Sequence, residues 1–100
     1  MSVELSTGTI ERIERLFSGP DRDVVVHLLV ADCADNLPFW EHATADALER
    51  IRFAALKLSG GDVAKLRDAV RLAQTDWRDL LVAAGFADDV QAHRAWWPAA

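Results

Sequence analysis

The chain holds one cysteine and three histidines, the residue types most used for nucleophilic catalysis and for binding transition metals. Cys33 lies in the sequence DCAD, near the expected carboxyl end of a helix, where both the acids and the helix end raise a thiol pKa. We therefore interpret Cys33 as a buried core residue. The histidines are His27, His42 and His93, and none is paired at a spacing typical of metal sites. His27 lies in an apolar run and is expected in the core. No metal site and no cofactor are predicted.

Pairs of carboxylates are the next candidates, because general acid–base catalysis needs two acids that converge on a pocket with separated pKa values. Each pair in this chain lies where an acid would simply cap or flank a helix end. The sequence SGGD lacks the lysine and the spacing of a phosphate loop, and no serine has a nucleophile context. We therefore expect a non-enzymatic protein. The pairs are Asp21/Asp23, Asp32/Asp35 and Asp88/Asp89.

Three arginines, Arg67, Arg71 and Arg78, fall at a spacing that lines one outward face of a continuous helix, where they would contact phosphates. Acids lie beside this stripe, and the chain has a net charge of −5, which disfavours non-specific nucleic-acid binding. The charge is uneven: residues 21–49 hold seven acids and one base, whereas residues 50–78 hold seven bases and three acids. A small DNA-binding regulator or antitoxin-like protein is therefore the alternative function, and nucleic acid is not the favoured partner.

The elements that would position these residues are helices. Apolar residues recur at spacings of three and four along a chain that is 51% hydrophobic, which predicts an all-α, irregular bundle of five or six short helices. We expect a single domain over residues 1–100, with a flexible N-terminus over residues 1–8 and a frayed end over residues 98–100. The first helix is predicted over residues 9–17, with Thr9 as its cap.

The second helix is predicted from Pro20, with Asp21 and Asp23 near its positive end. Residues 24–30 contain three consecutive valines and would also suit a strand. We favour the helix because the chain has no second strand of similar quality with which to pair. This helix is apolar on almost every side, which indicates burial. Asn36 and Pro38 would end it, and Phe39 and Trp40 would then cover the core from a loop.

The third helix is predicted from Thr44 to about Leu58 and ends at Gly60. It has a wide apolar face and a second, smaller stripe made by Phe53 and Leu56. A helix with two apolar faces is either central in a bundle or carries an interface. We expect both, with Phe53 and Leu56 at the interface.

Asp62 is expected to cap a fourth helix over residues 63–84, which is either continuous or broken at Gln74 and Thr75. We favour the break, with Thr75 as the cap of the second part. Gly85 then ends the helix, with Phe86 touching Leu81 as in a Schellman motif.

A last short helix follows Asp88 or Asp89 and includes two adjacent tryptophans, Trp96 and Trp97. One helix cannot point both inward. Trp97 shares the side of Val90 and His93, and Trp96 falls on another, so Trp96 joins the candidate interface. In the other interpretation the two tryptophans form a C-terminal cap packed against Phe39 or Trp40.

The segment ERIRFAALKLSGGDVAKLRDAVRLAQTDWRDLLVAAGF, with DNLP upstream, resembles small uncharacterised bacterial proteins over residues 35–86. The resemblance is most specific in DWRDLLVAAGF, and it implies a compact helical protein of bacterial origin with no known activity.

Together these patterns favour a non-enzymatic protein–protein interaction module, with a protein partner or self-association through Phe53, Leu56 and Trp96. The chain has no apolar run long enough to cross a membrane and begins with no basic, apolar leader. Its lone cysteine cannot form an internal disulfide, so we expect a cytoplasmic location.

Overall fold

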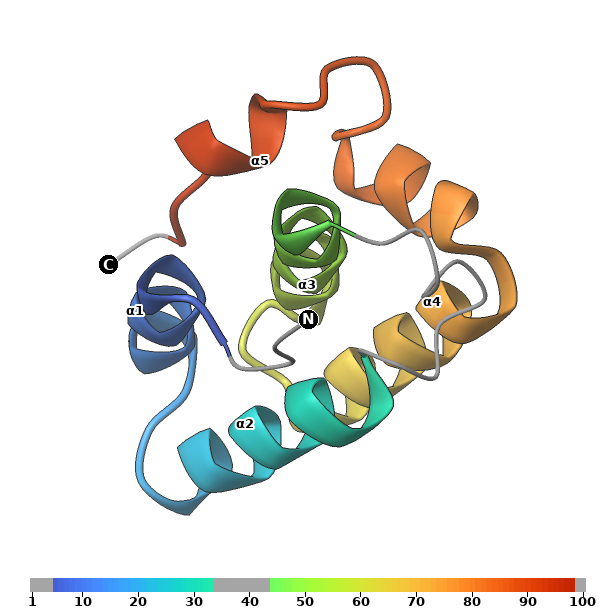
Figure 1. Cartoon of the computed structure of the whole chain (residues 1–100). Helices are drawn as coiled ribbons and strands as arrows, with labels where there is room; N and C mark the ends of the chain where they lie inside the picture. Colours follow the sequence, from blue (N-terminus) through green and yellow to red (C-terminus); the bar gives the residue numbers. More distant parts are fainter. Residues whose placement is uncertain (1–4, 34–43, 99–100) are drawn as a thin grey trace.

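The computed structural model describes residues 5–33 and 44–98, and this part of the chain forms five α-helices and no strand. The predicted all-α class is confirmed. α3 (Ala45–Ser59) lies in the middle, surrounded by α1 (Thr7–Leu16), α2 (Pro20–Asp32), α4 (Val63–Ala84) and α5 (Ala92–Ala95) (Figure 1). The predicted central position of the third helix is therefore confirmed. The expectations for Asn36, Pro38, Phe39, Trp40 and His42 lie outside the described residues.

α1 begins two residues before the predicted start. The Oγ atom of Ser6 accepts a hydrogen bond from the backbone N–H of Thr9 at 3.1 Å, so Ser6 is the cap. Thr9 lies inside the helix, where its buried hydroxyl is 2.8 Å from Ser6 Oγ. The prediction that Thr9 caps this helix was wrong. Serine and threonine are both good caps, and the spacing of the apolar residues does not distinguish Ser6 from Thr9. Residues 7 and 8, which lie in the segment 1–8 expected to be flexible, belong to α1.

α2 confirms the helical interpretation of residues 24–30. Pro20 occupies its first turn, where a missing N–H costs no hydrogen bond, and Asp21 and Asp23 follow. The expected all-round burial is wrong, because Val24 and Val26 remain 38% and 37% exposed. Among the described residues, α2 packs mainly against α1 and α4, at the edge of the bundle, which leaves the side bearing Val24 and Val26 exposed.

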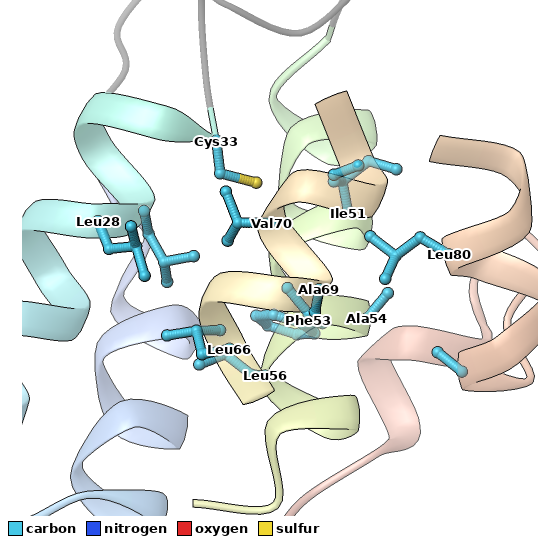
Figure 2. Close-up of a cluster of buried hydrophobic side chains, with 14 of the residues drawn as sticks. Leu28, Cys33, Ile51, Phe53, Ala54, Leu56, Leu66, Ala69, Val70 and Leu80 are labelled. Atoms are coloured by element: carbon cyan, nitrogen blue, oxygen red, sulfur yellow. The ribbon is translucent and has the colours of Figure 1, made fainter. Parts of the chain in front are cut away.

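α3 is buried on nearly all sides. The hydroxyl of Thr44 accepts from the N–H of Ala47 at 3.0 Å, and Gly60 ends the helix in the left-handed conformation, both as predicted. Phe53 is 1% exposed and Leu56 is fully buried, and Figure 2 shows both among the core side chains. Their predicted position on an exposed second stripe is wrong, because α3 has helices on several sides and both of its apolar faces are covered.

α4 contains the predicted break, one residue later than expected. Asp76 leaves the helical conformation (φ −152°, ψ 87°), and its Oδ1 atom accepts from the N–H of Asp79 at 3.3 Å. Asp76, and not Thr75, therefore caps the second part of the helix. The end at Gly85 is the predicted Schellman motif, because the N–H of Phe86 donates to the Leu81 carbonyl at 2.9 Å.

The core lies mainly between α3 and α4, where small residues from both helices meet. Ala54 and Ala55 on α3 are fully buried, as is Ala73 on α4, and Ala69, one turn before Ala73, is also buried. Figure 2 shows Ala54 and Ala69 among the core side chains. Alanine adds little width to a helix, so these positions let the two helices approach closely while the larger side chains interdigitate around them.

Candidate functional site

Cys33 is fully buried at the end of α2, as the sequence predicted. Burial raises the pKa of its thiol to about 12, with Asp32 adding to the effect and Arg52 opposing it. Because the thiolate is the reactive form, Cys33 is chemically inert in the folded protein.

Arg52, which was not predicted as a functional residue, binds the backbone at the carboxyl end of α2, beside Cys33. Its side chain is buried, and its guanidinium donates to the carbonyls of Cys33 at 3.1 Å and Leu29 at 3.4 Å. Burial lowers the pKa of Arg52. The arginine supplies donors to carbonyls that the end of a helix leaves unpaired. The sequence does show a single arginine within the apolar stretch IRFAAL, which indicates a buried arginine. It does not show that the carbonyls of Cys33 and Leu29 are the groups that this arginine binds.

The two tryptophans exchange their predicted positions. Trp96 packs on the core, with its ring centroid 6.2 Å from that of Phe53 and 6.4 Å from that of Phe86, whereas Trp97 is 42% exposed. α5 ends at Ala95, and Trp96 is already extended (φ −79°, ψ 132°), so helical spacing does not determine the direction of either ring. The proposed interface of Phe53, Leu56 and Trp96 therefore lacks the exposed surface on which it was based.

Arg12 holds this C-terminal segment against α1. Its guanidinium donates to the carbonyls of Trp96 at 3.0 Å and Arg94 at 3.3 Å. The same group lies 4.1 Å from the centroid of the Phe53 ring and 3.6 Å from that of Trp97. Burial lowers the pKa of Arg12, with Glu49 opposing the effect. The role of Arg12 could not be predicted from the sequence, because the carbonyls to which it donates lie more than eighty residues away along the chain.

Of the two histidines in the described residues, His93 is buried, and His27, which was predicted in the core, is exposed. The ring of His93 is 1% exposed between Phe53 and Phe86, and neither of its nitrogens has a hydrogen-bond partner within the described residues. Glu49 Oε1 lies 3.7 Å from Nε2, beyond hydrogen-bond distance. Burial lowers the pKa of His93. Over residues 5–33 and 44–98, no three metal-ligating side chains gather in one place.

The break at Asp76 divides the predicted arginine stripe. Arg67 and Arg71 lie before the break and face α2, whereas Arg78 lies after it, with its guanidinium 5.3 Å from the centroid of the neighbouring Trp77 ring. The three arginines therefore do not form the single outward row that a continuous helix would give them.

The side of α4 that bears Arg67 and Arg71 forms a groove with α2. Two adjoining hollows, of about 470 and 220 Å³, share Leu28, Asp32 and Arg67 and so make one continuous depression. We call it the α2–α4 groove. Its lining residues are Asp23, Val24, His27, Leu28 and Asp32 from α2, and Arg67, Val70, Arg71 and Gln74 from α4.

The charges of the α2–α4 groove are separated by helix. Its α2 wall carries the carboxylates of Asp23 and Asp32, and its α4 wall carries the guanidinium groups of Arg67 and Arg71. Leu28 and Val70 are buried and form an apolar floor between the walls. At one end, Gln74 Nε2 donates to the Asp32 carbonyl at 2.8 Å and joins the two helices. The groove thus combines a floor that excludes water with two walls of opposite charge.

Comparison with models of known protein families, with curated proteins and with solved structures found no match to this chain. No helix in the described part of the chain is long and apolar enough to cross a membrane.

Proposed function

We propose that this chain is a protein–protein interaction module whose docking surface is the α2–α4 groove. The observation that carries the proposal is an apolar floor between charged walls, bordered by the exposed Val24. Grooves between helices commonly receive an apolar helix face from a partner, and charged rims fix its orientation. This surface replaces the one predicted from Phe53, Leu56 and Trp96.

The burial of the most reactive side chains agrees with a binding role. Cys33 is enclosed in the core, and His93, on α5, is enclosed against Phe53 and Phe86, so neither side chain is open to a substrate from solvent. Since the chain has a single cysteine and therefore no internal disulfide, we propose a cytoplasmic location.

The proposal is tested by placing a photo-crosslinking amino acid at Val24 in the full chain and irradiating cells that produce it. Position 82 is the matched control, because Val82 is also an exposed valine but lies on the second part of α4, outside the groove. We expect a discrete protein adduct from position 24 that position 82 does not give, and we expect Arg67→Asp to remove it. Equal labelling from both positions, or an adduct that Arg67→Asp leaves unchanged, would contradict the proposal.

Nucleic-acid binding through Arg67, Arg71 and Arg78 is the second candidate, and its support is weaker. The acids of α2 face Arg67 and Arg71 across the groove, and Asp68 pairs with Arg71 at 3.7 Å. A phosphate group that approaches Arg67 and Arg71 would therefore also be repelled by the neighbouring carboxylates. This candidate requires salt-dependent binding of double-stranded DNA that weakens when the three arginines are neutralised. An unchanged mobility of mixed DNA fragments at low salt would exclude it.

A further inference from the structure

We infer that the α2–α4 groove binds the same groove of a second copy of this chain, so that the module is a two-fold symmetric dimer. This inference rests on the proposed function and identifies its partner. It comes from the distribution of charge in the groove, where the carboxylates, with His27 beside them, line the α2 wall and the guanidinium groups line the α4 wall. A surface of this kind is complementary to itself after rotation, because each wall then meets the opposite one.

Both walls carry their charges along the length of the groove. Asp23 lines the first hollow, Arg71 lines the second, and Asp32 and Arg67 line both. The amide of Gln74, farther along α4, bonds to the carbonyl of Asp32 at the end of α2. α2 and the first part of α4 therefore run side by side in the same direction along the groove (Figure 1).

Only one of the two simple arrangements satisfies these charges. A two-fold axis that runs along the groove places α2 of each copy over α4 of the other, with the helices still parallel. Asp23 and Asp32 of each copy then face the α4 wall of the other, and Arg67 is the arginine of that wall nearer to Asp23. An axis across the groove would place α2 over α2 and bring acids against acids, which is unfavourable. The charge pattern therefore selects the first axis.

Apolar contact and charge have different roles in this arrangement. The side chains of Val24, Leu28 and Val70 supply the surface that loses water when the two grooves close. The carboxylates and guanidinium groups at the rim stay partly hydrated, so they set orientation and specificity more than affinity. Each rim pair occurs twice in a symmetric dimer, and its reversal therefore acts twice.

The test uses charge reversal in the full chain, measured by sedimentation equilibrium at low and moderate salt. Asp23→Arg alone gives two arginine–arginine contacts, and Arg67→Asp alone gives two acid–acid contacts. We expect each variant to weaken dimerisation by about tenfold or more. An equimolar mixture of the two should recover a heterodimer, because every contact in it again joins opposite charges.

Two variants outside the groove serve as controls. Asp79→Arg and Arg78→Asp make the same charge changes on exposed residues of the second part of α4. We expect both to dimerise as the unaltered chain does. Helical circular dichroism of each variant verifies its fold, and recovery in the mixture itself requires that both variants are folded.

The outcomes separate the dimer from the proposed function. A chain that stays monomeric up to about 1 mM overturns the dimer, and so does a mixture that fails to recover. If position 24 still crosslinks a different protein, the groove is a docking surface and only the identity of the partner was wrong. If position 24 gives no specific adduct, the proposed function fails as well.

Discussion

Two buried arginines join distant parts of this chain through backbone carbonyls. Arg52 reaches the end of α2, and Arg12 reaches the residues around Trp96. A buried carbonyl without a donor costs more than an ordinary hydrogen bond contributes, so each arginine stabilises the fold through the groups that it keeps paired. These arginines therefore have a structural role. From the sequence alone, an isolated arginine in an apolar stretch would be equally consistent with a binding site.

Replacing Arg52 with methionine tests this role. Methionine keeps much of the apolar length but leaves the carbonyls of Cys33 and Leu29 without this donor. We expect the free energy of unfolding to fall by about 2 kcal/mol or more, measured by urea denaturation. Lys65→Met on the exposed face of α4, outside the α2–α4 groove, should change it by less than about 0.5 kcal/mol. Equal effects would contradict the assigned role of Arg52.

His93 makes stability depend on pH. The group titrates near 6.5 in an unfolded chain, and burial lowers its pKa in the folded protein. As the pH falls below about 6.5, the unfolded chain takes up a proton that the folded protein resists, so its stability decreases. We expect His93→Leu to lose part of this acid sensitivity, seen as a smaller drop in Tm between about pH 7.5 and pH 5.5.

The exposed His27 provides the control for that experiment. His27→Gln removes an exposed imidazole, so comparing it with His93→Leu separates the effect of the buried ring from the effect of losing any histidine. If His93→Leu and the unaltered chain lose the same stability on acidification, His93 is not the group responsible.

At the scale of elements, the break in α4 depends on a local cap. Asp76 accepts from the N–H of Asp79, whereas the Thr75 hydroxyl donates back to the Arg71 carbonyl at 3.0 Å. We expect Asp76→Ala to lower the free energy of unfolding by about 1 kcal/mol. Thr75→Ala should have less than half that effect. Thermal denaturation of the two variants measures these losses. A larger loss of stability for Thr75→Ala would mean that Thr75, as predicted from the sequence, is the cap.

The helices were largely predictable because their ends are encoded locally. Thr44, Asp62 and Gly85 act where the sequence placed them, since a cap or a left-handed glycine needs only its neighbours. The exposure of whole faces was less predictable. Phe53 and Leu56 suggested a surface because periodicity does not reveal how many helices surround α3.

The groove was signalled in the sequence, although only indirectly. Acids dominate residues 21–49 and bases dominate residues 50–78, and the fold brings α2 from the first segment beside α4 from the second. The asymmetry of charge was visible, but the pairing of Asp32 with Arg67 in one hollow required the tertiary structure. Arg78 was grouped with the other arginines because the break in α4 could not be placed with certainty.

For the whole molecule, α3 and α4 make the most extensive contact between two helices of the described residues. We expect Ala54→Leu to destabilise the protein by about 1–3 kcal/mol, because the larger side chain separates the two helices. Ala83→Leu adds the same atoms at an exposed position of α4 and should change stability by less than about 0.5 kcal/mol. Urea denaturation compares them, and similar stabilities would mean that the α3–α4 contact tolerates expansion.

The bonds from Arg12 to the carbonyls of Trp96 and Arg94 also bear on the order in which the molecule opens. They join positions 84 and 82 residues apart, and α5 itself is only four residues long. A short element held mainly by such remote contacts can detach while α3 and α4 stay packed, so it belongs to the low-stability end of the molecule. Amide hydrogens of α5 should therefore exchange with deuterated solvent well before those of α3. Detachment of this segment would expose the ring of Phe53, which His93 and Trp96 cover in the folded protein, and would transiently open the core to solvent.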